Sequence, residues 1–396
     1  IGQYETFLLI AGAFTFFWVN GFLKVMMPMH AEKTEKEKRV LIFNIFILLS
    51  AFALIAALLS VSLNTQVSAL LLNGNKVPMP LLLGLYIFFN SPALMTEYIY
   101  MVNKQAKKII TYASIIFGLQ VAAVGLPPLL GMGLNWVIGG LMLSTLVKYV
   151  WLLTVLRKNA KPVFSKLLIN EFFKYGTPLV VSFLLSSSAR YIDGFIVTAK
   201  FTPNDLAIFQ YGARELPLSL LLCNSLSMAM LPNFSKKDLA SPLAEFRSEV
   251  YRLHWLLFPV SILLILLSHT LFPIIFNPDF KESASIFNIY LLLVITRLLF
   301  PQTLLIAKKF NKTIVRASLI EIIVNVTFSL ILVNHFGIKG VAYATVVAYL
   351  VEKVYLAIAC KRKLNIGINS YLPVKTFAIS SSLLVAVFIL VEFIIY

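Results

Sequence analysis

The stretch FFKYGTPLVVSFLLSSSARYIDGFIVTAK, residues 172–200, decides how the rest of the sequence is interpreted. As a helix it is long enough to cross the core of a bilayer, which takes about 20 apolar residues. Two charged residues, Arg190 and Asp193, nevertheless lie inside it. A charge at the centre of a membrane helix costs about 2.5–3.5 kcal/mol on insertion scales, so such a residue faces a partner or a water-filled cavity. The stretch therefore predicts a membrane helix with a functional face.

The composition of the whole chain also indicates a membrane protein. Of its 396 residues, 59% are hydrophobic and 13% are charged, whereas a soluble chain carries about 25% charged residues. The apolar segments lack the polar face that helices of a soluble protein need. We therefore predict an all-α, polytopic membrane protein. Its twelve predicted spans are residues 4–28, 40–63, 79–102, 108–131, 134–156, 171–199, 206–232, 251–276, 283–306, 313–334, 338–360 and 372–396.

Basic residues give the chain a formal net charge of +17, but their positions argue against nucleic-acid binding. The loops after the first, third, fifth, seventh, ninth and eleventh spans hold 22 of the 34 Lys and Arg residues. The intervening loops hold four: Lys76, Lys200, Lys281 and Lys339. This alternation follows the positive-inside rule and predicts that the basic loops are cytoplasmic. Ile1 then begins on the outer side, so we expect the sequence to belong to a longer protein and to lack its first helix.

The sequence contains no recognisable motif for catalysis, metal binding or nucleotide binding. The four histidines are scattered without ligand spacing, and no HExxH, Walker or GxGxxG pattern occurs. Cys223 and Cys360 both lie in predicted spans, which argues against a disulfide or a metal site. We therefore expect a protein that is not an enzyme and that binds neither a cofactor nor a metal ion.

A weak internal repeat predicts two halves. GQYETFLLI, which starts at residue 2 and leads to a Met-rich end, resembles IFQYGARELPLSLLL, which starts at residue 208 and also leads to a Met-rich end. Both segments cross from outside to inside, as in a parallel repeat. The predicted parts are an N-terminal lobe (1–157), a cytoplasmic linker (158–170), a C-terminal lobe (171–360) and an extra C-terminal helix (361–396).

Charged residues inside the spans are the candidate site residues. The deep basic candidates are Lys24, Lys148, Arg190, Arg214 and Arg297, and the acidic candidates are Glu97, Asp193, Glu215, Glu321 and Glu352. Near the inner boundary, snorkelling of a long side chain toward water is the simpler interpretation. It applies to Lys24, Glu97, Glu352 and Lys353.

A polar stripe follows the sixth span. Ser182, Ser186, Arg190 and Asp193 recur at spacings of four, four and three, which places them on one helical face. Serine in membrane helices commonly bonds neighbouring helices, but a single stripe that ends in two charges favours a face in contact with water. An ion pair between Arg190 and Asp193 is the alternative interpretation.

Two further arginines strengthen the prediction of a cationic cavity. Arg214 and Glu215 lie about two turns into the next, antiparallel span, and Pro217 is expected to kink that helix. Arg297 lies near the middle of the ninth span. Because a guanidinium binds phosphate in bidentate fashion, these arginines predict a cavity for an anionic substrate.

Three segments resemble Wzx-type polysaccharide flippases. EFFKYGTPLVVSFLLSSSARYIDGFIVTAKFTPNDLAIFQYG, residues 171–212, resembles the seventh helix of that family and the start of its eighth. LPNFSK, residues 231–236, is similar to the end of the eighth helix. Residues 311–356 are similar to the eleventh and twelfth helices, most clearly in GIKGVAYAT, with Gly337, Gly340, Ala342, Ala344 and Thr345.

This family belongs to the multidrug/oligosaccharidyl-lipid/polysaccharide (MOP) exporter superfamily, whose fold the resemblance implies. That fold has two pseudo-symmetric, MATE-like lobes of six helices plus one or two extra helices, and it works by alternating access. The implied activity is flipping of an undecaprenyl-pyrophosphate-linked oligosaccharide across the bacterial cytoplasmic membrane for O-antigen, lipopolysaccharide, capsule or exopolysaccharide synthesis. The implied energy source is an ion gradient (H⁺ or Na⁺). A polysaccharide polymerase and glycosyltransferases are the expected protein partners.

The resemblance also assigns roles by position. Together with Arg297, it gives the substrate-binding candidates Asn20, Lys24, Arg190, Arg214 and Arg297. Some members of the superfamily bind a cation between the seventh, eleventh and twelfth helices. The implied coupling or charge-pairing residues are Asp193, Glu215, Glu321, Asn325 and Thr345.

Three alternatives stay open at this point. A MATE-like, cation-coupled drug exporter would favour acidic and aromatic cavity walls, and the excess of deep arginines argues against it. A lipid II flippase would share the fold and the cationic cavity. A membrane polysaccharide polymerase or ligase would need a large outer loop, and no predicted outer loop exceeds about 15 residues.

Overall fold

The computed structural model describes residues 1–234, 239–308 and 310–395. These residues are 87% helical and contain no strand, which confirms the predicted fold class. Within the helices, some side chains are outside the described set, at positions 28, 31, 32, 175, 178, 179, 181–183, 185–187, 189, 190 and 232.

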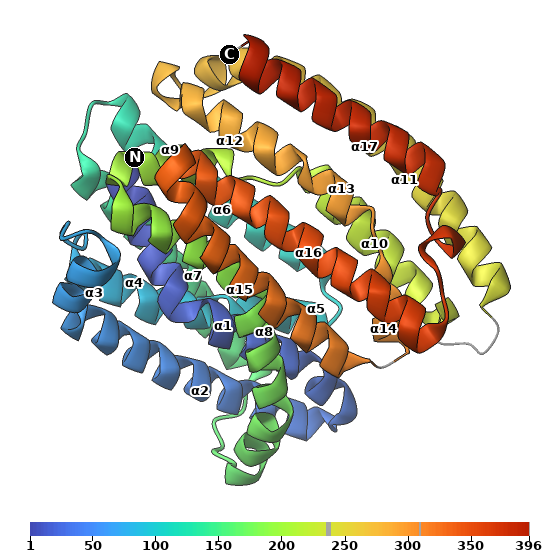
Figure 1. The fold of residues 1–396 in the computed structure, drawn as a ribbon. Coiled ribbons are helices and arrows are strands. Elements are labelled where there is room, and N and C mark those ends of the chain that lie inside the picture. The colour runs from blue at the N-terminus through green and yellow to red at the C-terminus, as the bar shows by residue number, and fades with distance from the viewer. Residues whose placement is uncertain (235–238, 309, 396) are drawn as a thin grey trace. The chain divides into compact units, whose positions relative to one another are not determined.

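The helices follow one another along the chain with short connections (Figure 1). They are α1 (Gly2–Glu32), α2 (Glu35–Ser62), α3 (Asn64–Leu71), α4 (Pro80–Ala93), α5 (Met95–Val102), α6 (Ala106–Leu129), α7 (Leu134–Asn159), α8 (Lys166–Lys200), α9 (Pro203–Gly212), α10 (Pro217–Phe234), α11 (Ala240–Ile275), α12 (Lys281–Leu291), α13 (Leu293–Arg297), α14 (Pro301–Ala307), α15 (Asn311–Phe336), α16 (Ile338–Leu364) and α17 (Val374–Ile389). The 3₁₀ turns η1 (Pro278–Phe280) and η2 (Ile368–Ser370) and a π-helical segment, η3 (Leu390–Ile395), complete the set.

A helix, or a helix with a break, lies over each of the twelve predicted spans. Eight helices among the described residues are long and apolar enough to cross a membrane, or nine if the bent run Pro278–Ala307 counts as one span. Several of the other predicted spans are divided by breaks that the sequence prediction treated as continuous helix. Proline explains the positions of two breaks, because Pro217 and Pro301 each occupy the first helical position after one.

The chain forms two compact units. Unit 1 comprises Ile1–Tyr191 and Thr198–Pro203, and unit 2 comprises Ile192–Val197 and Asn204–Tyr396. Helix α8 therefore contributes residues to both units. The predicted lobe boundary at residues 158–170 stays a prediction.

The two units share one order of helix packing. In unit 1, α1 packs on α2, α2 on α4, α4 on α7, and α6 on α7. In unit 2, α10 packs on α11, α11 on α12, α12 on α16, and α15 on α16 (Figure 1). The third helix in this order is broken in both units. It is divided into α4 and α5 in unit 1, and into α12, α13 and α14 in unit 2. This correspondence agrees with the internal repeat that the sequence indicates.

The C-terminal helix is attached to the rest of unit 2 by polar contacts at two positions along α11. The imidazole Nε2 of His254 in α11 lies 2.7 Å from the hydroxyl of Ser380 in α17. Fifteen residues further along α11, Nε2 of His269 lies 2.8 Å from Oε1 of Glu392 in η3. Asn288 of α12 donates to the same carboxylate oxygen at 2.7 Å. The C-terminal helix is thus part of the core of unit 2.

Close helix contacts at two glycines fix the corresponding pairs α6–α7 and α15–α16. A Cβ atom on Gly140 of α7 would overlap the backbone carbonyl of Ala123 in α6. A Cβ atom on Gly340 of α16 would overlap the backbone of Leu332 in α15. Each pair can therefore approach this closely only with glycine at the contact.

We expect Gly140→Ala to lower the melting temperature of the purified protein, because overpacking a tight contact costs about 1–3 kcal/mol. Gly139→Ala is the matched control, since no atom lies within 4 Å of its added Cβ and alanine favours the helix by about 1 kcal/mol. Equal melting temperatures for the two variants would contradict the packing described here.

Candidate functional site

A helix break inside unit 2 contains two of the charged residues that the sequence analysis singled out. Helix α9 ends at Gly212, and α10 begins at Pro217, so Arg214 and Glu215 lie in non-helical backbone. The prediction of a continuous span with a kink at Pro217 is therefore wrong. Outside a helix, the directions of adjacent side chains are not fixed by the helical rotation of about 100° per residue, and here the two side chains have different surroundings.

Glu215 pairs with Arg297, which ends α13 at a second break. The Nε and Nη2 atoms of Arg297 donate to the two carboxylate oxygens of Glu215 at 2.7 and 2.6 Å. The guanidinium also lies over the ring of Tyr349 in α16, 4.8 Å from its centroid. Both charged side chains are about one-fifth exposed. The bidentate geometry satisfies both groups and holds the two breaks together.

This pairing corrects the prediction for Arg297. The sequence placed it among free cations for a phosphate, but the carboxylate of Glu215 already neutralises it. The excess of unpaired deep arginines is correspondingly smaller than the sequence suggested.

Arg214 keeps an unpaired charge among the described residues. Its side chain is exposed, and Nε donates to the carbonyl of Gln210 at 3.0 Å, near the end of α9. This bond orients the stem of the side chain and leaves the two terminal nitrogens for a ligand. An exposed guanidinium at this depth needs water or an anion beside it.

A buried polar cluster joins α8, α15 and α16. The hydroxyl of Thr345 lies 2.8 Å from Oδ2 of Asp193 and 3.1 Å from the Val341 carbonyl, while Asn325 donates to that hydroxyl at 3.1 Å. Asp193 is only 2% exposed, and Asn325 is 1% exposed. Oδ1 of Asp193 and Oδ1 of Asn325 have no hydrogen-bond partner among the described residues.

The structure thus brings together three of the five residues assigned to cation coupling or charge pairing, Asp193, Asn325 and Thr345. They offer carboxylate, amide, hydroxyl and carbonyl oxygens, and two of these oxygens are unsatisfied. Hard monovalent cations prefer oxygen donors of this kind. No group of three or more His, Cys, Asp or Glu residues suited to a metal occurs in the described part of the chain. A coupling role for the cluster stays a prediction.

Further ionisable side chains lie along the same interior. Glu321 is 8% exposed, and it interacts electrostatically with Glu352, Lys353, Arg297 and Asp193. Glu352 and Lys353 form an ion pair of 2.9 Å, with side chains 5% and 6% exposed. Snorkelling toward water is therefore the wrong interpretation for this pair, because its heads are buried in protein.

A small polar cavity adjoins these charges in unit 2. Arg297 and Lys353 line it together with polar side chains of α10 and α14. Two of those side chains, Thr303 and Ser227, are bonded to each other across the helices at 3.0 Å. The polar members of the lining are Asn224, Ser227, Arg297, Gln302, Thr303 and Lys353.

The remaining candidates lie in unit 1 or outside the described side chains. Asn20 and Lys24 are exposed, and the Asn20 amide donates to the Phe16 carbonyl at 3.0 Å. Arg190 belongs to α8, but its side chain lies outside the described residues, as do those of Ser182 and Ser186. Neither the predicted stripe nor an Arg190–Asp193 ion pair is therefore described.

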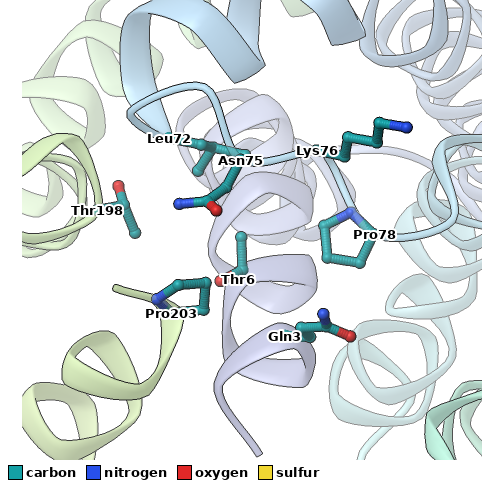
Figure 2. A pocket seen from close by; sticks show the side chains of 8 residues that line it. All are labelled: Gln3, Thr6, Leu72, Asn75, Lys76, Pro78, Thr198 and Pro203. Atoms are coloured by element: carbon teal, nitrogen blue, oxygen red, sulfur yellow. The ribbon is translucent and has the colours of Figure 1, made fainter. Parts of the chain in front are cut away.

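Unit 1 carries a separate polar pocket where the loop before α4 meets the ends of α1 and α8. Figure 2 shows Thr6 and Gln3 of α1 beside this loop, with Thr198 of α8 across from them. The hydroxyl of Thr198 donates to the carbonyl of Leu71 at 2.7 Å, and that of Thr6 donates to Gly2 at 2.9 Å. The first bond ties α8 to the end of α3, and the second lies within α1. The charge pattern predicts that this end lies on the outer side.

Broken helices in unit 2 bring charged and polar side chains together, an arrangement that secondary transporters also use. Solved structures agree on the fold. The chain is similar to an inward-closed structure of the lipid II flippase MurJ, with 18% identity, a TM-score of 0.72 and coverage of 98% of this chain and 86% of that chain. It is also similar to an inward-facing multidrug resistance MATE family transporter (11%, 0.67, 98% and 90%) and to a MATE transporter from Vibrio cholerae (13%, 0.54, 91% and 86%).

These features define a multi-pass helical membrane protein with the fold of the MOP superfamily. The family model for the lipid II flippase MurJ matches residues 8–396, so the chain belongs to the MurJ family. No curated protein matches the sequence. Membership makes the protein an inner-membrane flippase for a lipid-linked substrate, and not an enzyme.

The predicted membership in the Wzx-type flippases is wrong, because the family model over nearly the whole chain is that of MurJ. The O-antigen and lipopolysaccharide assignments, and the expected polymerase and glycosyltransferase partners, lose their support with it. The most specific motif behind the resemblance contains Gly340, whose role is close packing of α15 on α16. Such a residue reports the shared fold and not the substrate.

The Glu215–Arg297 pair gives a direct test of the site geometry. We expect Glu215→Gln to destabilise the purified protein by about 3 kcal/mol, the lower end for breaking a buried pair, since both side chains keep some exposure. The double change Glu215→Gln with Arg297→Gln should recover part of this loss, because it leaves no unpaired charge. Thermal unfolding in detergent measures both effects, and additive losses would contradict the pairing.

Proposed function

We propose that this protein translocates lipid II, the peptidoglycan precursor, across the inner membrane. The observation that carries the proposal is the MurJ family model, which matches residues 8–396. The lipid-linked substrate carries a pyrophosphate, so its passage needs cationic groups that are free to bind it. Among the described candidates in unit 2, Arg214 best meets that requirement, because Arg297 is already paired.

Arg214 would bind the pyrophosphate through its terminal nitrogens. The planar guanidinium offers two parallel donors to phosphate oxygens, which an ammonium cannot. Its fixed Nε bond to Gln210 reduces the side-chain entropy that binding costs. We also propose that Arg190, Lys24 and Asn20 contact the anionic substrate.

The Asp193–Asn325–Thr345 cluster would hold the coupling cation, H⁺ or Na⁺. A cation there would satisfy the two unpartnered oxygens of Asp193 and Asn325. It would also neutralise a carboxylate that is 2% exposed. Burying an unpaired charge is costly, so cation binding and the packing of α8 on α15 and α16 would be energetically linked.

Transport of fluorescent lipid II in proteoliposomes tests the substrate assignment. We expect the protein to move lipid II faster than an undecaprenyl-pyrophosphate glycan of similar size that lacks the peptide. Equal rates for both lipids would refute selectivity for lipid II, and movement of neither would refute the proposal as a whole.

Arg214→Ala is expected to lower the rate of lipid II transport about tenfold or more, because a hydrogen bond to a charged group contributes about 1.5–3 kcal/mol. Arg214→Lys should retain part of the rate, since it keeps the charge and loses the bidentate geometry. The control is Arg252→Ala, an exposed residue of α11 that pairs with Glu249 one turn away. A normal rate for Arg214→Ala would exclude Arg214 as a pyrophosphate-binding residue.

Asp193→Asn is expected to abolish the dependence of transport on the cation gradient. Thr345→Val, which removes one oxygen ligand and keeps the side-chain volume, should raise the cation concentration at half-maximal rate several-fold. Transport rates measured against Na⁺ concentration and against a pH gradient check both variants. Unchanged dependence in Asp193→Asn would exclude the cluster as the coupling site.

A further inference from the structure

A second polar pocket of unit 2 opens at the end that the charge pattern places on the outer side. Three exposed charged residues at η1 and the start of α12 line its mouth: Asp279, Lys281 and Glu282. Lys339, at the start of α16, lines it as well. Lys281 and Lys339 belong to two of the sparsely charged loops, which the positive-inside rule places outside. Protons of the outer aqueous phase can therefore enter this pocket.

The inner part of the pocket is a contact between a histidine and a glutamate. Nε2 of His269 in α11 lies 2.8 Å from Oε1 of Glu392 in η3, and the two side chains are only 4% and 5% exposed. Asn288 of α12 donates to the same oxygen at 2.7 Å, and Ser285 is a further hydrogen-bond partner of the carboxylate. The amide and the hydroxyl are neutral at every ordinary pH. Protonation of His269 therefore changes the contact with Glu392 into an ion pair.

The other charged groups around this contact keep their charge near neutral pH. Histidine is the side chain type that changes charge between about pH 5 and 8, whereas carboxylates titrate at lower pH and lysine and tyrosine at higher pH. Tyr343 of α16 also interacts electrostatically with Glu392. The titratable groups of the described residues that line the pocket or act on Glu392 are Asp279, Lys281, Glu282 and Lys339, together with His269 and Tyr343.

The two attachments of the C-terminal helix differ in this respect. Helix α17 packs along α11 (Figure 1). Its contact nearer the cytoplasmic side joins His254 to the hydroxyl of Ser380, which carries no charge. Its contact nearer the outer side joins His269 to the carboxylate of Glu392. Only the second contact gains an ion pair when its histidine is protonated.

The segment that carries Glu392 is itself unusual. η3 (Leu390–Ile395) is π-helical and continues directly from α17. Such segments are rare and are frequent at functional sites. A buried carboxylate that has only neutral partners is costly, and an ion pair removes most of that cost. Protonation of His269 therefore favours the state in which η3 lies against α11.

We propose that the His269–Glu392 contact is a pH-dependent attachment of η3 to α11, controlled by protons from the outer side. An ionised carboxylate only accepts hydrogen bonds, so Nε2 of His269 carries a hydrogen and the additional proton binds at Nδ1. The contribution of the ion pair is present at low pH and is lost as the pH rises and His269 becomes neutral. The attachment depends neither on lipid II nor on a coupling cation.

The mobility of η3 as a function of pH tests this proposal. A spin label is placed on the exposed position of Ile395→Cys, in a protein whose buried Cys223 and Cys360 are replaced by alanine. Electron paramagnetic resonance of the protein in lipid nanodiscs, without substrate, then reports the mobile fraction of the label. We expect that fraction to rise several-fold between pH 5 and pH 8. A mobile fraction that does not change with pH would overturn the proposal.

Three substitutions in the labelled protein locate the group responsible. His269→Gln and Glu392→Gln should each abolish the pH dependence, because neither can form the ion pair. His254→Gln is the matched control, since it changes the other histidine contact between α11 and α17 and should keep the pH dependence. Retained pH dependence in His269→Gln, or its loss in His254→Gln, would exclude the His269–Glu392 contact as the origin.

Separate control of the pH on the two sides of a membrane tests the source of the proton. In proteoliposomes of known orientation, the label at position 395 should respond to the pH of the compartment that faces the outer end of unit 2. A response to the pH of the cytoplasmic side alone would overturn the outer-side control.

Discussion

The cost of burying charge away from water governs the interior of unit 2. Every ionisable side chain placed there must find an opposite charge, a proton or an ion, because the bilayer around the helices offers none. Arg297 and Glu215 meet this demand with two short hydrogen bonds, and Lys353 and Glu352 meet it as direct neighbours in sequence. Asp193 meets it only in part, with neutral partners and one unsatisfied oxygen. Asp193 is therefore a group in unit 2 that still needs a proton or a cation.

Helix breaks make these pairings geometrically accessible. In a continuous helix, Arg214 and Glu215 would be fixed about 100° apart around the axis. The non-helical segment between Gly212 and Pro217 instead leaves Arg214 exposed and lets Glu215 reach Arg297. Backbone polar groups freed by a break are tolerated in a membrane protein only where protein or a water-filled cavity surrounds them. The polar cavity beside Arg297 meets that condition.

Much of the architecture could be predicted from the sequence, because apolar segments of bilayer length and alternating basic loops leave few other folds. Asp193, Asn325 and Thr345 were grouped by the family resemblance and do lie in contact, while their coupling role stays a prediction. The Glu215–Arg297 pair could not be predicted, since 82 residues separate its members and the break changes the direction of both side chains. The burial of Glu352 and Lys353 was missed because their position near a helix end favoured snorkelling. The family was missed because packing residues such as Gly340 dominated the motif.

The C-terminal helix is held by specific polar contacts to α11. Extra helices at the end of a transporter are readily treated as additions that a chain can gain or lose. Here Ser380 and Glu392 supply partners to His254 and His269, two polar side chains deep within α11. A chain without α17 and η3 would leave the Nε2 atoms of both imidazoles without these partners, so removal of the last helix would also disturb the interior face of α11.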